Sequence, residues 1–307
     1  MELQVKKVLV LGASGYVGSK LVSALRHQGI SVRAAGRSAE SLRRHPWAHD
    51  QGVELFSGID ILNQDSLRQA CAGCEVVYYL VHSMNPQTKD FVEADRQGAK
   101  NLAAAAQQGG VKRIIYLGGL GDDHTALSQH LRSRHEVSRI LHAGAVPVTT
   151  LRAAMIIGRG SISFEILRSL VNRLPVMVTP RWVSTESQPI AIVNVVEYLV
   201  GCLLNPQTAG ETYDIGGPDI LSYRALMDIY AQEARIVKRF IIPVPLLTPQ
   251  LSAYWIQLVT PFSASIARPL AEGLRNRVVC QDERIRQIVP QKVFDCREAI
   301  RQALQSS

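Results

Sequence analysis

The stretch VLVLGASGYVGSKLVSAL, residues 8–25, joins an apolar run to a helical pattern through three glycines. In strand–turn–helix units that bind dinucleotides, the first glycine permits a tight turn and the second lets the backbone approach a phosphate. The third lets the helix pack closely on the strand. The helix N-terminus then offers unpaired N–H groups to a pyrophosphate. We therefore predict a dinucleotide-phosphate loop made by Gly12, Ser14, Gly15, Tyr16, Val17 and Gly18.

Apolar runs alternate with helix-like segments through the first half of the chain. Strands are predicted at 7–12, 31–36, 53–56, 75–82, 112–118 and 147–152. Helices are predicted at 15–28, 38–45, 65–72, 89–109 and 126–143. Nearly continuous apolar strands separated by helices indicate an α/β fold with a doubly wound parallel sheet covered on both faces. Ligands are then expected beyond the carboxyl ends of the strands.

The pattern changes after residue 157. Helices are predicted at 161–173, 194–204, 222–233, 250–260 and 295–305, with prolines in the connections between them. We predict a dinucleotide-binding domain over residues 1–157. A smaller, mainly helical substrate lobe over residues 158–307 would pack on it and close over the ligand edge of the sheet.

The end of the second predicted strand bears on the choice between NAD and NADP. An NAD site usually has a carboxylate there for the adenosine ribose, whereas this chain has Gly36 followed by Arg37 and Ser38. A guanidinium and a hydroxyl would bind a 2′-phosphate. We therefore predict NADP(H) as the preferred cofactor. The alternative is that Arg37 is an ordinary solvated arginine, which leaves NAD(H) open.

Two further strand ends supply candidate cofactor contacts. Asp60 follows the third strand, where its carboxylate could accept a hydrogen bond from the adenine amino group. Leu80, Val81 and His82 end the fourth strand, beside the expected nicotinamide, and Ser83 follows as a polar candidate for the substrate. The alternative for residues 80–83 is ordinary packing at a strand end.

The segments LGASGYVG, DILNQDSL, VVYYLVHS, RIIYLGGLG and VTTLRAAMIIG occur in this order. With them the chain resembles the short-chain dehydrogenase/reductases, in the atypical branch that includes the NmrA-like proteins and relatives of the complex I 39-kDa subunit. The resemblance covers nearly the whole chain and implies an NAD(P)-binding Rossmann domain. It leaves activity open, because this branch contains both enzymes and non-enzymes.

Enzymatic members of the wider family carry a serine after the fifth strand and a Tyr-x-x-x-Lys motif on the next helix. The resemblance aligns the serine with Gly118 and Gly119, the tyrosine with His130 and the lysine with Arg134. His130 is therefore a candidate catalytic acid, and Arg134 a candidate catalytic and cofactor contact. The alternative for His130 is a pocket-wall or exposed histidine. The neighbouring Arg132, His135 and Arg139 are expected in solvent.

Other segments give candidate substrate contacts and limit the chemistry. PRWVSTESQPI, residues 180–190, offers Arg181, Trp182 and Gln188 to the substrate. The Cys-x-x-Cys motif at 71–74 spans a turn between a helix and a strand, without a second pair or a histidine cluster. We interpret it as structural and predict no metal site.

A stretch of 28 residues from Phe240 to Ala267 has no charged side chain, and four prolines interrupt it. Two interpretations remain open. The segment is lobe core or a dimer contact, or the region 240–275 attaches peripherally to an anionic membrane, since basic residues follow the apolar run. The oligomeric state is not predicted.

The whole-chain composition narrows partners and compartment. The net charge of +8 indicates an anionic partner, but nothing in the sequence resembles a nucleic-acid-binding module, so we predict none. Five scattered cysteines and no secretory leader predict a reducing, cytoplasmic setting. The predicted function is an NADPH-dependent oxidoreductase acting on an apolar carbonyl, ene or quinone-like substrate. The alternative is a non-catalytic NADP(H)-bound sensor or assembly factor with a protein partner.

Overall fold

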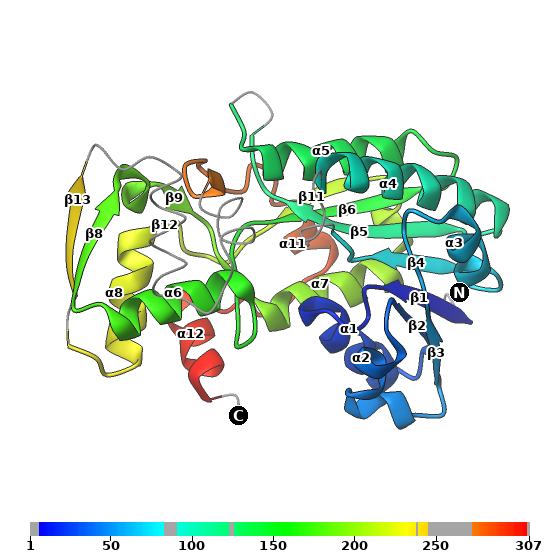
Figure 1. The fold of residues 1–307 in the computed structure, drawn as a ribbon, viewed down its shortest axis with the longest axis horizontal. Coiled ribbons are helices and arrows are strands. Elements are labelled where there is room, and N and C mark those ends of the chain that lie inside the picture. Colours follow the sequence, from blue (N-terminus) through cyan, green and yellow to red (C-terminus); the bar gives the residue numbers. More distant parts are fainter. Residues whose placement is uncertain (1–5, 83–90, 123–125, 238, 245–271, 306–307) are drawn as a thin grey trace.

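The computed structural model describes residues 6–82, 91–122, 126–237, 239–244 and 272–305. Its main element is a parallel sheet of seven strands in the order β11–β6–β5–β4–β1–β2–β3 (Figure 1). The strands are β1 (Lys7–Leu11), β2 (Ser31–Gly36), β3 (Val53–Ser57), β4 (Val76–Tyr79), β5 (Arg113–Gly119), β6 (Val148–Ala153) and β11 (Thr212–Ile215). The prediction of a doubly wound α/β fold is confirmed.

Helices cover both faces of this sheet. One face packs against α1 (Tyr16–His27), α2 (Ala39–Arg43) and α7 (Ile192–Leu204). The other packs against α3 (Gln64–Cys71), α4 (Phe91–Gln108) and α5 (Gln129–His142). Strand β1 shows why its sequence is apolar throughout: Val8 and Val10 enter the first core, and Leu9 and Leu11 the second. Alternating residues of a strand face opposite sides, so a sheet covered twice needs apolar residues at every position.

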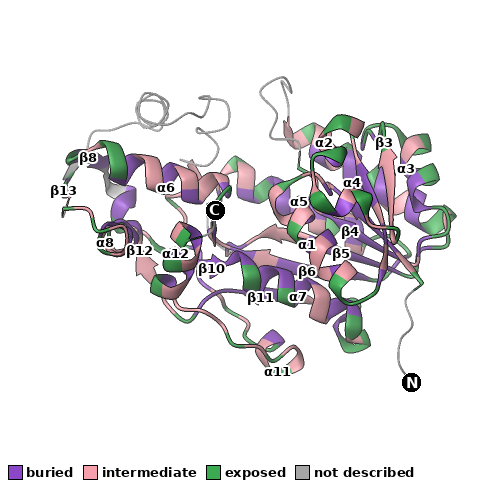
Figure 2. Cartoon of the chain, turned by 90° about the horizontal axis from the view of Figure 1, so that it is seen from below, coloured by how far each residue is buried: buried purple, intermediate pink, exposed green. Residues whose placement is uncertain are grey.

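A second lobe has its own core (Figure 1). It contains α6 (Ile162–Arg173), α8 (Tyr223–Glu233) and α12 (Cys296–Gln305), with the parallel pair β8 (Val176–Pro180) and β13 (Phe240–Val244). Two short pairs join β7 (Ile156–Ile157) to β10 (Ile190–Ala191) and β9 (Glu186–Ser187) to β12 (Leu221–Ser222). Single turns lie at η1 (Pro46–His49), η2 (Arg181–Ser184), η3 (Pro206–Thr208) and α11 (Ile285–Ile288). Figure 2 shows buried residues inside both lobes.

The two lobes do not divide cleanly at residue 157. Strand β11 pairs with β6 as the edge strand of the main sheet, and α7 packs against α1 across the sheet's first face. Both come from the second half of the chain. The four residues of β11 give too short an apolar signal to be recognised as a strand from sequence. The predicted helix at 250–260 lies outside the described residues.

A buried arginine ties this returning segment to the sheet. Arg113, at the start of β5, donates from Nε to Thr149 Oγ1 at 3.0 Å and from Nη1 to the Cys202 carbonyl at 2.7 Å. It also contacts the Thr208 hydroxyl. These bonds join two central strands to the end of α7 and the turn before β11. Buried polar groups need hydrogen-bond partners, so the bonds of Arg113 specify where the edge strand is placed.

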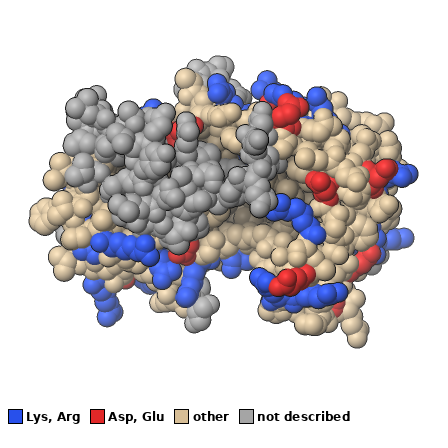
Figure 3. Space-filling model, in the orientation of Figure 1, with Lys and Arg blue, Asp and Glu red and all other residues tan. Residues whose placement is uncertain are grey.

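Two surface features are the distribution of charged side chains and the hydropathy of the described helices. On the face drawn in Figure 3, Lys and Arg side chains lie in several separate places, some of them beside Asp or Glu. None of the helices within the described ranges is both long enough and apolar enough to cross a bilayer. Most of the region 240–275, for which a peripheral membrane contact was considered, lies outside those ranges.

Candidate functional site

The glycine loop connects β1 to α1 in the geometry predicted for a phosphate loop. Gly12 has φ of +88°, a conformation that side chains strongly disfavour. A Cβ on Gly18 would lie 2.2 Å from the Gly12 carbonyl oxygen, so the helix can approach the turn only with glycine there. Gly15 caps α1 without any side-chain hydrogen bond. The first-turn N–H groups of α1 are therefore available to an anionic ligand.

A cavity of about 620 Å³ lies beyond the carboxyl ends of β1, β2, β3 and β4. Its lining contains predicted cofactor contacts from all four strand ends: Gly12, Ser14, Gly15, Arg37, Asp60, Leu80, Val81 and His82. Arg37 is exposed and has no ion-pair partner among the described residues. Ser38, beside it, caps α2 by accepting from the Ser41 N–H at 3.3 Å. The Asp60 carboxylate accepts from the Leu62 N–H at 2.9 Å.

A second cavity, of about 270 Å³, continues from the glycine loop toward the second lobe. The ends of β4, β5 and β6 line it together with α5 and the start of α6. It brings together Gly12, Gly15, Tyr16, Val17, Gly18, Leu80, His82, His130 and Arg134, all predicted from sequence. The two cavities share Gly12, Gly15, Leu80 and His82, and together they form one groove along the carboxyl edge of the sheet, where a dinucleotide is expected to bind.

The histidines of this groove are uncharged at neutral pH. Burial and the nearby Arg134 guanidinium lower the pKa of His130 to about 3. Desolvation, Arg134 and His130 hold the pKa of His82 well below its usual range. The sequence argument for His130 as an acid assumed an ordinary histidine that titrates near neutrality. Here the imidazole is neutral near pH 7 and cannot act as a general acid, so we do not propose that role for His130.

Arg134 retains its charge in a largely buried position. Its Nη1 donates to Tyr116 Oη at 3.5 Å, and that hydroxyl donates to the Arg134 carbonyl at 3.3 Å. Burial opposes the charge, but Tyr116 and the buried Asp95 outweigh it, and the pKa of Arg134 is raised. The second cavity thus has the Arg134 cation beside two neutral imidazoles. A fixed cation there suits the ribose hydroxyls or phosphates of a dinucleotide.

A third, apolar cavity of about 160 Å³ opens from the same groove into the second lobe. The two share Gly119, His130, Ala153, Ala154 and Ser163. Its other walls are Leu120, Leu131, Met155, Ile166, Leu167, Leu170, Trp182, Tyr223, Met227, Gly273, Leu274 and Val278. Trp182 and Tyr223 meet edge to face with ring centroids 5.9 Å apart. The buried Trp182 Nε1–H has no acceptor among the described residues.

The structure places the remaining predicted site residues as follows. Trp182 lines the apolar cavity. Gln188 is buried with its amide engaged: its oxygen accepts from the Cys280 N–H at 2.9 Å, and its nitrogen donates to the Gly217 carbonyl at 2.7 Å. Both ends of the amide are therefore used to link Gln188 to Cys280 and Gly217, which suits a structural role rather than a substrate contact. Ser83 and the side chain of Arg181 lie outside what the structure describes.

One expectation about helix α5 is wrong. His135 was expected in solvent, but it is buried, with Nε2 3.1 Å from the Gly119 carbonyl oxygen. Arg132 and Arg139 are exposed as predicted. A Cβ on Gly119 would meet Leu131 and Arg134 of α5, and one on Gly121 would lie 3.7 Å from His135 Nε2, so the glycines at and after the end of β5 let the helix lie close to the backbone there. This close approach of the helix to the end of the strand is not visible in the sequence pattern.

Sequence reasoning missed most of the apolar cavity. Ile166, Leu167 and Leu170 of α6 and Tyr223 and Met227 of α8 build it. Their spacings of three and four residues gave a helix-face signal, but that signal is the same for core packing and for a pocket wall. Tyr16 was predicted as a loop contact. A Cβ on Gly158 would lie 2.1 Å from the Tyr16 hydroxyl, so the Tyr16 ring also packs the glycine loop against the second lobe.

The cysteines take no part in this groove. Cys71 and Cys74 are buried, and burial raises the pKa of Cys71 to about 12. Within the described ranges, no group of three or more His, Cys, Asp or Glu side chains could hold a metal ion. Both thiols are therefore placed as packing groups rather than as nucleophiles.

Comparison with known proteins gives one family match and several fold matches. The NmrA-like family model matches residues 4–174, more than half of the chain. The chain is 26% identical over 242 residues to an Arabidopsis thaliana protein named NADH dehydrogenase (ubiquinone) 1 alpha subcomplex subunit 9, mitochondrial. That alignment covers 77% of this chain and 60% of the relative. The chain spans only 60% to 64% of the length of the curated relatives that it matches over most of its own sequence.

Two solved structures show the same fold over nearly the whole chain. Triphenylmethane reductase of Citrobacter sp., in complex with NADP(H), has a TM-score of 0.75 at 18% identity, covering 96% of this chain and 99% of its own. The NADPH-dependent quinone oxidoreductase of Escherichia coli, in complex with NADPH, has a TM-score of 0.76 at 14% identity. That match covers 97% of this chain and 100% of the other. At these identities the likeness is one of fold.

Proposed function

Because the chain belongs to the NmrA-like family of NAD(P)-binding Rossmann proteins, we propose that it is an oxidoreductase that binds NADP(H) along the groove. Its substrate would be an apolar molecule with a reducible carbonyl, ene or quinone-like group. The observation that carries this proposal is the junction of two cavities. The apolar cavity of the second lobe shares Gly119 and His130 with the groove, at the end where a nicotinamide would lie.

The groove fits the cofactor residue by residue. The bare N-terminus of α1 suits a pyrophosphate, and the close packing of Gly18 on Gly12, which a Cβ on Gly18 would prevent, holds that N-terminus against the end of β1. Arg37 would hold the 2′-phosphate at the mouth of the adenosine cavity, and Asp60 lies in reach of the adenine side. Arg134 would bind the nicotinamide ribose or a phosphate oxygen. When bound, NADPH supplies a hydride.

The chain's own groups would orient the substrate rather than protonate it. The walls around Leu167, Leu170 and Met227 exclude water and favour an apolar body. Two neutral donors belong to residues that line the apolar cavity: the imidazole of His130 and the buried indole N–H of Trp182, which lacks an acceptor among the described residues. Either could donate to a substrate oxygen, because a buried donor without a partner is costly.

The absence of an acid among the described residues of the site narrows the range of substrates that we propose. Reducing a ketone creates an alkoxide, which needs a proton at once, and this site has neither the family's tyrosine nor a charged histidine. Reducing a quinone creates a resonance-stabilised phenolate, comparable in basicity to tyrosine at a pKa of about 10. Such an anion can take its proton later from water. We therefore favour a quinone-like acceptor among the three classes.

A second candidate function is a non-catalytic NADP(H)-bound sensor or assembly factor. The observation that favours it is the replacement of the usual serine, tyrosine and lysine by Gly118 or Gly119, His130 and Arg134. The Arabidopsis relative is named as a subunit of NADH dehydrogenase. A protein of this kind would use the apolar cavity for a bound effector, or would present the second lobe to a protein partner.

Transfer of deuteride from 4-deuterated NADPH separates the two functions. The test substrates are menadione and a benzoquinone with an apolar tail, with an enone and an aldehyde in parallel. Isotope transfer to a quinone is measured as loss of deuterium from the nicotinamide, because deuteride that ends on a quinone oxygen exchanges with water. We expect deuterium to leave one face of the nicotinamide only. Tight NADPH binding with no isotope transfer to any of the four would contradict the oxidoreductase and leave the sensor.

A further inference from the structure

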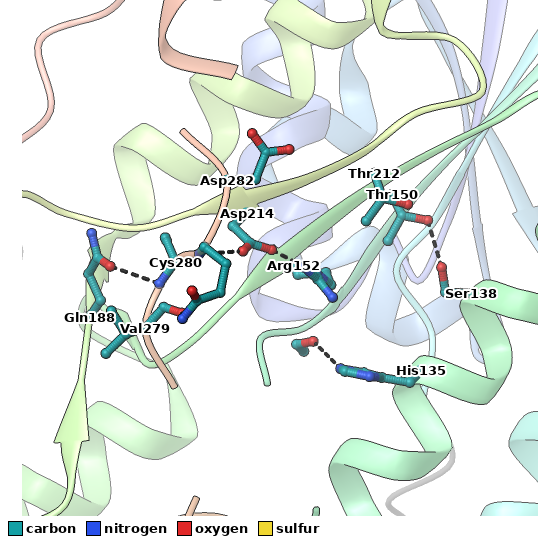
Figure 4. Close-up of polar contacts among 12 residues, drawn as sticks. His135, Ser138, Thr150, Arg152, Gln188, Thr212, Asp214, Val279, Cys280 and Asp282 are labelled. Atoms are coloured by element: carbon teal, nitrogen blue, oxygen red, sulfur yellow. Dashed lines mark hydrogen bonds and ion pairs between the residues drawn. The ribbon is translucent and has the colours of Figure 1, made fainter. Parts of the chain in front are cut away.

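A fourth cavity, of about 260 Å³, lies between helix α5 and the β6–β11 edge of the sheet. Ser138, Arg139 and His142 line it from α5, and Thr150, Arg152 and Thr212 line it from the two strands. Figure 4 shows Ser138 with the three strand residues. Gly118, Gly119, Arg134 and His135 complete the lining. Gly118, Gly119 and Arg134 also line the dinucleotide groove, so only the end of β5 and one side chain separate the two cavities.

The lining of this cavity is basic and rich in hydroxyl groups. It contains three arginines, two histidines, one serine and two threonines, and none of its lining residues is an Asp or Glu. Arg139 is exposed and has no hydrogen-bond or ion-pair partner among the described residues. A cavity with this composition is attractive to anions and poorly suited to cations or to apolar ligands.

Arg152 is held with one edge of its guanidinium free. Its Nε donates to Asp214 Oδ1 at 2.7 Å, and Asp214 is buried on β11. The second oxygen of Asp214 accepts from the Gln281 N–H at 2.8 Å, which fixes the carboxylate in turn. The two Nη groups of Arg152 make no hydrogen bond among the described residues, although the guanidinium also helps to lower the pKa of the Asp282 carboxyl. A guanidinium anchored through Nε and open at its other edge is preorganised to bind an oxyanion.

Three hydroxyls and an imidazole meet beside it. Thr150 Oγ1 lies 3.0 Å from Ser138 Oγ and 3.1 Å from His142 Nε2, and Thr212 Oγ1 lies 3.4 Å from the same nitrogen. Burial lowers the pKa of His142, so at neutral pH it is a neutral partner of the hydroxyls. Thr150 is fully buried and orients its neighbours, whereas Ser138 and Thr212 are partly exposed and can turn their hydroxyls toward the cavity. The helix and the strand edge therefore both present hydroxyl donors to the cavity.

We propose that this cavity is a second ligand site, which binds a small phosphate monoester. Arg139 and Arg152 bind the phosphate charge, the hydroxyls of Ser138 and Thr212 complete the contacts, and the buried Thr150 orients Ser138 and His142. Two guanidiniums with hydroxyl donors on other sides suit a tetrahedral, doubly charged group better than a planar carboxylate, which one arginine can satisfy. The volume of about 260 Å³ suits a small molecule rather than a polymer.

The site is independent of the proposed redox function, because binding is measured without turnover. NADPH also carries phosphates, so the protein is first saturated with NADPH, and glycerol 3-phosphate is then titrated by calorimetry. We expect one further binding event, weakened about tenfold or more by Arg139→Gln and by Arg152→Lys. Arg152→Lys retains a cation near Asp214 and loses the fork of donors. Thr150→Val removes one hydroxyl at nearly constant volume and is expected to weaken binding as well.

Arg132→Gln is the matched control. Arg132 is exposed on the same helix but does not line the cavity, so its loss changes the overall charge equally and should leave binding unchanged. Urea unfolding confirms that each variant is folded. The proposal is overturned if glycerol 3-phosphate shows no binding at millimolar concentration. It is also overturned if Arg132→Gln weakens binding as much as Arg139→Gln, or if citrate binds as tightly as the phosphate and with the same response to the variants.

Discussion

At the scale of single residues, helix α5 shows how one element serves two cavities. His130 and Arg134 lie four residues apart and line the dinucleotide groove. Ser138 and His142 continue the same row and line the fourth cavity, between α5 and the β6–β11 edge. Arg134 lines both the groove and this cavity. Residues four apart share one face of a helix. The sequence correctly predicts that this face is at the ligand edge, but not that it passes from one side of the β5 terminus to the other.

Arg37 gives a residue-scale prediction about cofactor choice. Arg37→Ala removes charge-assisted hydrogen bonds to a 2′-phosphate, which are worth about 1.5–3 kcal/mol. We expect NADPH affinity to fall by about ten- to hundredfold and NADH affinity to stay unchanged, as followed by nicotinamide fluorescence. Arg43→Ala is the control, since Arg43 is exposed on α2 but does not line the adenosine cavity. An equal loss for both cofactors would mean that Arg37 does not contact the 2′-phosphate.

At the scale of elements, the contact between β1 and α1 is the most constrained part of the site. Gly18→Ala would place a methyl group 2.2 Å from the Gly12 carbonyl oxygen, and that atom belongs to the backbone and cannot rotate away. The helix must move, so the N–H groups at its N-terminus no longer point at the pyrophosphate. We expect at least a hundredfold loss of affinity for NADPH and NADH alike, measured in the same fluorescence titration.

The control for this substitution is the neighbouring Ser19→Ala. Ser19 Oγ donates to the Tyr16 carbonyl at 3.2 Å, within the helix itself, so its removal leaves the turn in place. Normal NADPH binding by Gly18→Ala would show that the loop does not carry the pyrophosphate. Circular dichroism of both variants checks that α1 is retained.

The second lobe gives an element-scale prediction about the substrate. Met227 lies on α8 and lines the apolar cavity, whose volume is only about 160 Å³. Met227→Trp would fill much of this space. We expect quinone reduction to be lost, together with the quenching of tryptophan fluorescence by bound quinone, while NADPH affinity is kept. Unchanged quinone turnover in a folded Met227→Trp protein would place the substrate elsewhere.

Local signals predicted the first half of the fold well, and long-range pairing limited the rest. Strands β1 and β4 are apolar at nearly every position, and β2, β3, β5 and β6 are partly apolar. The glycines of the loop carry a geometric requirement that the sequence states directly. Strand β11 has four residues, and its place beside β6 depends on contacts such as Arg113 with Cys202 and Thr208. The apolar cavity was missed for a related reason, because a pocket wall and a core face have the same periodicity.

At the scale of the whole molecule, the second half of the chain is joined to the sheet at buried polar residues. Asn194, at the start of α7, donates to the Lys292 carbonyl at 2.8 Å and accepts from the Phe294 N–H at 3.0 Å. Asp214 links β11 to the segment at Gln281, and Gln188 links the second lobe to Cys280. These bonds hold the two lobes as walls of one groove. The dinucleotide groove and the apolar cavity therefore depend on the same long-range contacts.

The uncharged histidines make the stability of the molecule depend on pH in a defined direction. Desolvation lowers the pKa of His82, His130 and His142 below the value of about 6.5 expected in the unfolded chain. Below pH 6.5 the unfolded state therefore binds more protons than the folded state, and the free energy of unfolding falls as the pH falls. For His130 this loss continues toward pH 3, at no more than about 1.4 kcal/mol per pH unit.

His130→Asn removes one of these three groups, so its free energy of unfolding should fall less steeply than that of the natural protein between about pH 7 and pH 5. Urea unfolding at several pH values across this range measures both slopes, above the range where carboxylates such as Glu54 and Glu75 add losses of the same sign. His27→Asn, at an exposed position on α1, should leave the slope as it is. Parallel curves for His130→Asn and the natural protein would mean that His130 is protonated as easily in the fold as outside it. A catalytic acid at His130 would then become tenable again, since the argument against it depends on that missing proton.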